Sequence, residues 1–435
     1  MASGSWGGTE AGAEALGGAP RRAQPGAALA AWVRRALPFF GPAFLVSVGY
    51  MDPGNWATDI AAGSNFGYRL LWVVLASNLM AILLQAIAAT LGMRSGASLA
   101  ANAKRHFRPW VAWGFFVTAE LAAMATDLAE FLGAALGFHL LLGIPLVAAV
   151  FVAAVVVLGI LFVSGRAARR LEAVVLGMVG VVGLAYVLEV WLARPDWHAI
   201  AVGTLVPRLG SPSALLVAIG ILGATVMPHN IFLHSAAVLS RRRPGDDEHN
   251  RRALRFAYAD TAVALNVAWL VNASMIVMAA AVFAGHGLSV DSIEGAHRTL
   301  VPLLGPLAAA AFAVALLSAG LSSSVTGTLA GQTILEGFVG RRVSVFWMRL
   351  VTMVPALVVV ALGIDAFRML VLSQVFLSLQ LPFTVAALLC LAANPQVMGG
   401  RPVRGPALWL ASGVGLLIVA ANVLLLYGTL AGSAG

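Results

Sequence analysis

Long apolar runs separated by short polar connections occupy nearly the whole sequence. Residues 70–91, 148–163 and 408–427 are examples, and their lengths approach the ~20 residues that a helix needs to cross a bilayer. The alternation of apolar and polar residues that marks membrane β-strands is absent. Since helices satisfy their own backbone hydrogen bonds in hydrocarbon, the pattern predicts an all-α integral membrane protein.

The polar breaks divide this pattern into eleven predicted spans. They cover residues 37–66, 70–93, 110–136, 143–164, 170–193, 213–240, 255–284, 300–337, 345–363, 365–393 and 407–431. Residues 1–36 contain no apolar core followed by a cleavage site, so we expect a flexible cytoplasmic tail there. Residues 37–435 form the predicted transmembrane transport domain.

Composition agrees with this class and excludes others. The chain is 60% hydrophobic and 10% charged, whereas soluble domains carry roughly 25% charged residues. The single cysteine, Cys390, excludes an intrachain disulfide and a cysteine-based metal cluster. No phosphate-binding GxxxxGK[ST] motif is present, so neither ATP nor another nucleotide is expected as a partner.

The net charge of +9 is explained by membrane orientation rather than by nucleic acid. Most of the 27 Lys and Arg residues lie in the N-terminal tail and the even-numbered connections; the five exceptions are Arg69, Arg194, Arg208, Arg298 and Arg368. Because positive residues stay on the cytoplasmic side, this bias predicts a cytoplasmic N-terminus and an extracytoplasmic C-terminus. We expect a multi-pass protein of the cell (inner) membrane.

Two spans are interrupted by proline and polar residues. The first contains DPGN at residues 52–55 and the sixth contains MPHN at residues 227–230. A pair of broken helices in corresponding places indicates a midplane substrate site in a transporter made of inverted repeats. We therefore expect a first repeat at 37–193, an inverted second repeat at 213–393 and an extra helix at 407–431.

The two breaks supply candidate ligands for a cation. Proline has no N–H, so each break releases a carbonyl four residues earlier, that of Gly49 and that of Ala224. The Asp52 carboxylate, the Asn55 amide oxygen and the Met227 thioether stand beside them. A thioether favours Mn²⁺, Fe²⁺, Co²⁺ or Cd²⁺ over Mg²⁺ and Ca²⁺. The alternative is that both prolines only kink buried helices.

Several ionisable residues in apolar spans are candidates for a proton route. The third span carries three acids spaced by seven and three residues, close to one helical face. With the basic candidates, the set is Glu120, Asp127, Glu130, His229, His234 and Arg349. Such groups form proton relays when they line a cavity. The alternative is a static buried ion-pair network, and for Asp127 with Arg349 both interpretations can hold together.

The segments MDPGNWATD at 51–59 and GATVMPHNIFLH at 223–234 resemble the two signature segments of the Nramp family of proton-coupled divalent metal transporters. The resemblance covers the chain beyond residue 36, including the eleven spans and the basic connection after the sixth. It implies a leucine-transporter-type fold. It also implies a metal held by Asp52, Asn55, Met227 and the Ala224 carbonyl, with the Gly49 carbonyl taking part in some conformations.

The resemblance extends the site and the proton route. It implies a further ligand from the tenth span, expected at Gln374 with Gln380 as a nearby competitor. The resemblance also implies that protons move from the metal site to the cytoplasm along Asp127, Glu130, His229 and Arg349. Asp52 is then expected to exchange protons as the metal binds. Many relatives have two adjacent arginines at the start of the ninth span, whereas here Met348 precedes Arg349, which leaves the details of proton exit open.

The resulting hypothesis is an importer of Mn²⁺ or Fe²⁺ that is driven by protons and works by alternating access. The chain is not expected to be an enzyme or to hold a resident cofactor, and a monomer is compatible with the sequence. Two alternatives remain open: a same-fold transporter of Mg²⁺ or of an amino acid with Na⁺, and a passive metal channel.

Other polar residues receive structural interpretations. Thr58 and Asp59 are expected to cap the outer half of the first span. Residues expected at span ends as interface residues are Glu172, Asp260 and Glu336, and those expected in a solvated external connection are His286, Asp291 and His297.

Overall fold

The structure, a computed structural model, describes residues 41–430 except 165–167, 291 and 341–343. The predicted tail at 1–36 and Asp291 lie outside the described residues. All regular elements of the described part are helices, joined by short irregular connections. Their order is α2 (Pro42–Ser47), η2 (Val48–Met51), α3 (Pro53–Phe66), η3 (Gly67–Leu70), α4 (Leu71–Ser95), α5 (Leu99–His106), α6 (Pro109–Leu142), α7 (Leu146–Ser164), α8 (Ala168–Ala193), α9 (Trp197–Leu205), α10 (Pro212–Thr225), α11 (Pro228–Ala237), η4 (Val238–Arg241), α12 (Asp247–Val282), η5 (Ala284–His286), α13 (Ile293–Leu304), α14 (Pro306–Val339), α15 (Val345–Ala361), α16 (Ala366–Ala393) and α17 (Pro406–Leu430).

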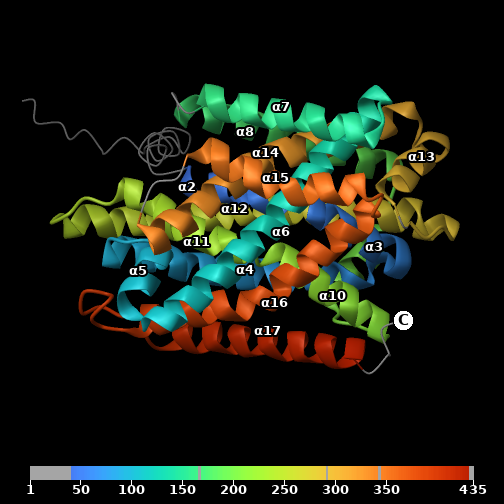
Figure 1. Cartoon of the computed structure of the whole chain (residues 1–435). Coiled ribbons are helices and arrows are strands. Elements are labelled where there is room, and N and C mark those ends of the chain that lie inside the picture. The colour runs from blue at the N-terminus through green and yellow to red at the C-terminus, as the bar shows by residue number, and fades with distance from the viewer. Residues whose placement is uncertain (1–40, 165–167, 291, 341–343, 431–435) are drawn as a thin grey trace, which may run out of the picture. The chain divides into compact units, whose positions relative to one another are not determined.

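The helices account for the predicted spans. In the described residues, eight stretches are long and apolar enough to cross a membrane, and two shorter apolar helices cover 146–160 and 346–361. One of the eight, 53–95, contains both α3 and α4, which run in opposite directions (Figure 1). Counting α3 and α4 as two crossings gives the eleven predicted spans.

Two helix boundaries differ from the prediction. Residues 293–304 form a separate helix, α13, where a single span from residue 300 was expected, because Gly305 has a φ of 93° and Pro306 begins a new helix. Helix α12 begins at Asp247, eight residues before the predicted start. Asp260 therefore lies buried inside α12 rather than at a span end.

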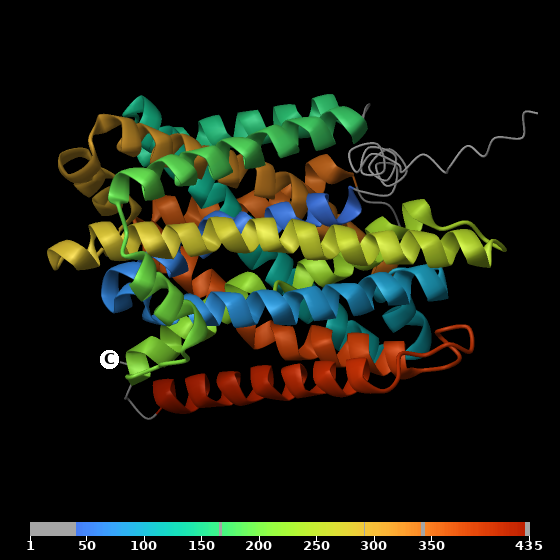
Figure 2. The ribbon, with the colours of Figure 1, turned by 180° about the vertical axis from the view of Figure 1, so that it is seen from behind.

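The positively charged connections gather at one end of the helices. Helix α5 and the connections at 238–247 and 394–405 lie together at this end, which we name the basic end (Figures 1 and 2). Helix α13, the end of α3 and the start of α10 lie at the other end, named the opposite end. This arrangement agrees with the alternation of basic and non-basic connections in the sequence.

Small residues let the central helices pack closely. A methyl group at Gly137 of α6 would lie 2.6 Å from the Leu317 Cα of α14, and one at Gly320 of α14 would meet the Ala134 backbone of α6. The Gly63 position of α3 similarly faces the Ile276 carbonyl of α12. Such close backbone approach is how helices associate in membranes. These contacts pack α6 closely against α14 and α3 closely against α12.

Candidate metal site

Asp52, the acid at the first break, caps the helix that follows the break. Asp52 has an extended backbone (φ −71°, ψ 161°), and its Oδ1 accepts a hydrogen bond of 3.0 Å from the Asn55 N–H at the start of α3. Asp52 is fully buried. The predicted capping role of Thr58 and Asp59 is wrong, because both lie inside α3 and the proline at the first helical position places the cap at Asp52.

Two amides converge on the carbonyl that precedes the break. Asn55 Nδ2 donates to the Tyr50 carbonyl at 2.6 Å, and Asn272 Nδ2 of α12 donates to the same oxygen at 2.8 Å. With their N–H groups used in this way, the Oδ1 atoms of Asn55 and Asn272 have no hydrogen-bond partner among the described residues. A buried acceptor oxygen without a partner is available to a cation.

The second break presents a sulfur and another amide. Met227 has an extended backbone (φ −74°, ψ 120°) between α10 and α11, and Pro228 begins α11. Asn230 Nδ2 donates to Met227 Sδ at 3.4 Å, and both side chains are fully buried. The Ala224 residue, whose carbonyl the proline releases, is also buried.

A glutamine of α16 touches both broken helices. Gln374 Nε2 donates to Asp52 Oδ2 at 3.3 Å, and the amide occupies the space where a side chain at Gly54 would lie. The Gln374 backbone carbonyl packs against Gly223 of α10, close to the second break. The competing Gln380 instead donates to Thr118 of α6 at 3.5 Å, so the structure brings Gln374 to Asp52.

The two breaks also meet directly. A methyl group at Gly49 would lie 3.0 Å from Asn230 Oδ1, so η2 packs against the start of α11. No group of three or more His, Cys, Asp and Glu side chains that could hold a metal is found within the described ranges. The donors at the breaks are instead one carboxylate, neutral oxygens and a sulfur. This weakly charged set suits a cation that is bound and released better than a permanent metal centre.

Three of the predicted proton-route residues form one buried group. Arg349 Nη1 of α15 donates to Asp127 Oδ1 of α6 in an ion pair, with side-chain exposures of 1% and 5%. A side chain at Gly327 of α14 would collide with the carboxylates of both Asp127 and Glu130. Glu130 is fully buried and lies within electrostatic range of Asp127, Arg349 and Asp52.

The remaining candidates are placed differently. His229 Nδ1 lies 3.2 Å from Thr126 Oγ1, next to the acid group, and its Nε2 has no partner in the part of the chain that the structure describes. Glu120 is only half-buried, two turns before Asp127 on α6. The structure therefore brings His229 to the acid group and leaves Glu120 at its margin.

His234 belongs to a separate hydrogen-bonded chain. Its Nδ1 lies 2.8 Å from Gln85 Oε1 of α4, and Gln85 Nε2 donates to the Tyr50 hydroxyl at 2.5 Å. This series of hydrogen bonds therefore ends at Tyr50, beside the first break. Gln85, Tyr50 and Asn272 were missed in the sequence, although a polar residue inside an apolar span is itself a signal.

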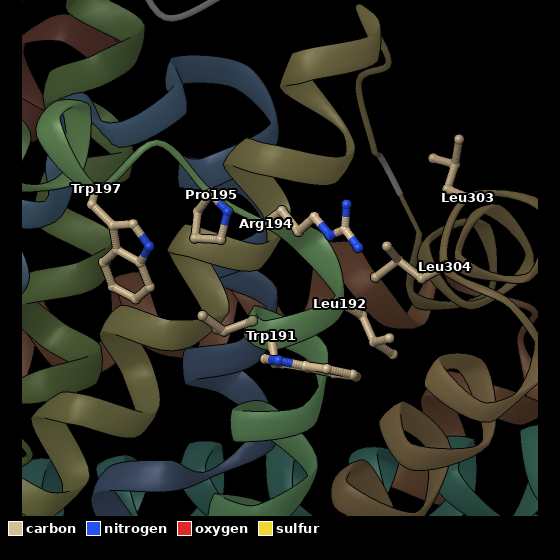
Figure 3. A pocket seen from close by; sticks show the side chains of 8 residues that line it. Trp191, Leu192, Arg194, Pro195, Trp197, Leu303 and Leu304 are labelled. Atoms are coloured by element: carbon tan, nitrogen blue, oxygen red, sulfur yellow. The ribbon is translucent and has the colours of Figure 1, made fainter.

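A surface cavity of about 640 Å³ lies away from these groups (Figure 3). It is formed at the opposite end by the end of α8, the start of α9 and α13, and its lining residues are Val190, Trp191, Leu192, Arg194, Pro195, Trp197, Leu303 and Leu304. None of the candidate ligands lines it. The candidate site is therefore the buried set at the two breaks.

Comparison with known proteins identifies the family. The family model described as "Natural resistance-associated macrophage protein-like" matches residues 43–428. The chain is 47% identical over 391 residues to the "Divalent metal cation transporter MntH" of Burkholderia ambifaria, covering 90% of this chain and 89% of the relative. It is 45% identical over 403 residues to the protein of the same name from Deinococcus radiodurans, covering 92% of each.

Solved structures agree. The Eremococcus coleocola manganese transporter, in complex with an aromatic bis-isothiourea substituted compound, aligns with a TM-score of 0.81 and 34% identity over 91% of this chain and 87% of that chain. Mhp1, a nucleobase-cation-symport-1 family transporter, shares the fold alone, with a TM-score of 0.59 and 16% identity over 85% of this chain and 81% of that chain. The predicted leucine-transporter-type fold is confirmed, and the chain belongs to the Nramp family.

Proposed function

We propose that this protein is a proton-coupled secondary transporter that imports divalent transition-metal ions, Mn²⁺ or Fe²⁺, with Co²⁺ and Cd²⁺ as further substrates. The observation that carries the proposal is the buried Asp52 carboxylate at the two helix breaks. It accepts a hydrogen bond from Gln374 and lies near acceptor oxygens that have no partner among the described residues. The names of the relatives, divalent metal cation transporter and manganese transporter, support the same class of cargo.

The proposed ligands come from both breaks and from α16. They are the side chains of Asp52, Asn55, Met227 and Gln374 and the carbonyls of Ala224 and Gly49. Gln374 now donates an N–H to Asp52, and its Oε1 has no partner within the described ranges. A rotation of this amide presents the oxygen to a cation at Asp52. The Met227 sulfur then favours transition metals over Mg²⁺ and Ca²⁺.

Metal and proton interact through Asp52. A divalent cation favours the ionised carboxylate, so a proton on Asp52 leaves when the metal binds. Glu130, within electrostatic range of Asp52, is the proposed next acceptor, followed by Asp127 with Arg349 and by His229. Glu120, at the margin of this group, is a further proposed member of the route, and His234 is proposed as a second branch that leads through Gln85 to Tyr50 beside the first break.

Alternating access follows from the discontinuous helices. We propose that α2 and α3 rock together with α10 and α11, so that the shared site faces each side in turn. Each of the proposed repeats, 37–193 and 213–393, contributes one of these broken helices, and 407–431 is the added helix. A single chain supplies the whole donor set, which supports a functional monomer without a resident cofactor.

The proposed orientation follows from the charges. The basic end faces the cytoplasm of the cell (inner) membrane, the N-terminus is cytoplasmic and the C-terminus is extracytoplasmic. Thiol labelling from outside intact cells tests this orientation. An Asp247→Cys variant at the basic end should stay unlabelled and an Arg208→Cys variant at the opposite end should react; the reverse pattern contradicts the proposal.

Uptake of Mn²⁺ into proteoliposomes at several inner and outer pH values tests the function. Asp52→Ala should abolish uptake, since it removes the only acid at the breaks. Glu336→Gln removes an acid of α14 that accepts a hydrogen bond from Gln332, and it should transport like the parent. Parent rates in Asp52→Ala would contradict the site. Mn²⁺ uptake that does not depend on a pH gradient would favour a passive metal channel. Mg²⁺ uptake as fast as Mn²⁺ uptake would favour a Mg²⁺ transporter of the same fold.

A further inference from the structure

A second cavity, of about 470 Å³, lies at the basic end and apart from the metal site. Its walls come from the last turns of α4, from α12, from the connection at 394–405 and from the start of α17. Helix α4 packs against both α12 and α17, and Figure 2 shows it between them. We name this space the basic-end cavity. None of the proposed metal ligands lines it.

One part of the basic-end cavity is positively charged. Arg94, in the last turn of α4, and Arg404, in the connection, both line it and are exposed. Neither forms an ion pair with an acid in the described ranges, whereas the nearby Arg401 pairs with Asp247 at 3.1 Å. The described lining contains no acid. The cavity therefore presents two uncompensated cations, which favour an anionic ligand.

The other part of the cavity is apolar. Leu83, Ala86 and Ile87 line it from α4, and Val403 lines it from the connection. Leu83 precedes Arg94 by eleven residues, which corresponds to about 16 Å along the helix toward the interior of the membrane. The lining thus changes from charged to apolar along α4. A ligand that matches both parts has an anionic head and a hydrocarbon chain.

A pair of hydroxyl groups lies between the two parts. Thr90 Oγ1 donates to the Ala86 carbonyl at 2.7 Å, so the Tyr258 hydroxyl, 2.7 Å from the same oxygen, donates to Thr90. This bond joins α4 to α12 and fixes the phenol at the cavity wall. Tyrosine is enriched where the hydrocarbon of a membrane meets the head groups. Its position agrees with a boundary between Leu83 and Arg94.

We propose that the basic-end cavity binds an anionic phospholipid, with the phosphodiester at Arg94 and Arg404 and the start of an acyl chain along Leu83 and Ala86. A guanidinium group matches phosphate oxygens in a bidentate manner. Arg94 Nη1 donates to the Arg401 carbonyl, which uses only one of its five N–H donors. Basic pockets between transmembrane helices bind anionic head groups in this way. The bound lipid connects α4 to the 394–405 connection, and this role does not depend on the transported substrate.

Native mass spectrometry of the purified full chain in a neutral detergent tests the binding. Phosphatidylglycerol should bind more tightly than phosphatidylcholine with the same acyl chains. Arg94→Gln and Arg404→Gln should each weaken the binding of phosphatidylglycerol about fivefold, and the double variant about 25-fold, as expected for the attraction of one basic residue each to an anionic lipid. The control Arg105→Gln removes an exposed arginine of α5 at the same end and should bind like the parent. Equal binding of the two lipids, or an equal loss in the control, overturns the proposal.

A variant that keeps both arginines tests the apolar part of the cavity. Ala86→Leu places a larger side chain in the cavity and should prevent the binding of phosphatidylglycerol; unchanged binding overturns the proposal. Inorganic phosphate distinguishes a lipid from a soluble anion. At the same molar concentration it should not displace the lipid, because it has no chain to contact Leu83. Displacement by phosphate overturns the lipid in favour of a soluble anion.

Melting temperatures separate binding from folding. Without added lipid, Arg404→Gln should melt like the parent, since this side chain is exposed. Phosphatidylglycerol should raise the melting temperature of the parent and of Arg105→Gln, because a ligand that binds only the folded state stabilises it. It should not raise that of the variant that lacks both Arg94 and Arg404. An increase in this double variant equal to that in the parent overturns the proposal.

Discussion

The buried pair of Asp127 and Arg349 allows proton transfer and structural support to be separated. The change Asp127→Asn keeps the size of the side chain but leaves the guanidinium of Arg349 without its carboxylate. Both side chains are almost fully buried, at 5% and 1% exposure. Breaking such a pair costs about 3–5 kcal/mol, because a charge remains uncompensated. Glu130 lies within electrostatic range of Arg349. If Glu130 ionises in the variant, its carboxylate partly compensates the guanidinium, and the loss of stability falls toward the lower end of this interval.

The double variant Asp127→Leu with Arg349→Met removes both charges together. Replacing a buried ion pair by apolar residues of similar volume is neutral or stabilises by about 1–4 kcal/mol. We therefore expect the thermal stability of the double variant to return to the parent value or to exceed it. Proton flux driven by Mn²⁺ should remain lost in both variants, since the carboxylate is absent from each.

Thermal unfolding in detergent and metal-driven acidification of proteoliposomes measure the two effects. A stable double variant without proton flux supports both roles. Parent-like proton flux in the double variant would show that the pair only connects α6 to α15. An Asp127→Asn variant as stable as the parent would refute the argument that Arg349 depends on this carboxylate.

Three further substitutions test other parts of the structure. Met227→Ala should keep part of the Mn²⁺ uptake but admit Ca²⁺ or Mg²⁺, because the softer ligand is lost. The control Met275→Ala removes another buried methionine and should leave the selectivity unchanged. Equal selectivity in the two variants would contradict the role of the Met227 sulfur. Gly133→Ala places a methyl group against the Pro53 ring at the start of α3 and should destabilise the protein by about 1–3 kcal/mol. In the control Gly159→Ala the methyl group meets no described atom within 4 Å. Equal melting temperatures of the two variants would count against close packing of Gly133 on Pro53. Asp260→Asn weakens the bonds of 3.2 and 3.0 Å that two backbone N–H groups at the start of α2 donate to Asp260 Oδ2. It should speed amide hydrogen exchange there, and unchanged exchange would show that Asp260 does not hold α2.

The positions of the helix breaks could be predicted because their cause is local. Proline lacks an N–H wherever the chain places it, so Pro53 and Pro228 interrupt their helices independently of the neighbours. The spans follow from hydropathy for a similar reason, since a run of apolar residues needs no partner to enter a bilayer. The resemblance at the two breaks then implied most of the proposed ligands.

Contacts between helices could not be predicted in the same way. Gln374 and Gln380 are both polar residues of one apolar helix, and only the rotation of α16 directs the first to Asp52 and the second to Thr118. Between Glu172 and Tyr186, helix α8 is apolar on every side, so its sequence does not indicate which neighbouring helices surround Glu189 near its end. The assignment of Asp59 as a cap failed because Asp59 lies inside α3, whose cap is Asp52.

The sequence by itself therefore determined the membrane class, the two interruptions and the acids, amides and sulfur beside them, because each depends on covalent structure or on local hydrophobicity. The tertiary structure alone decided which of these groups meet. It placed Gln374 at Asp52 and directed His234 to Gln85, because helix rotation and close packing through glycine are set by the whole assembly of helices.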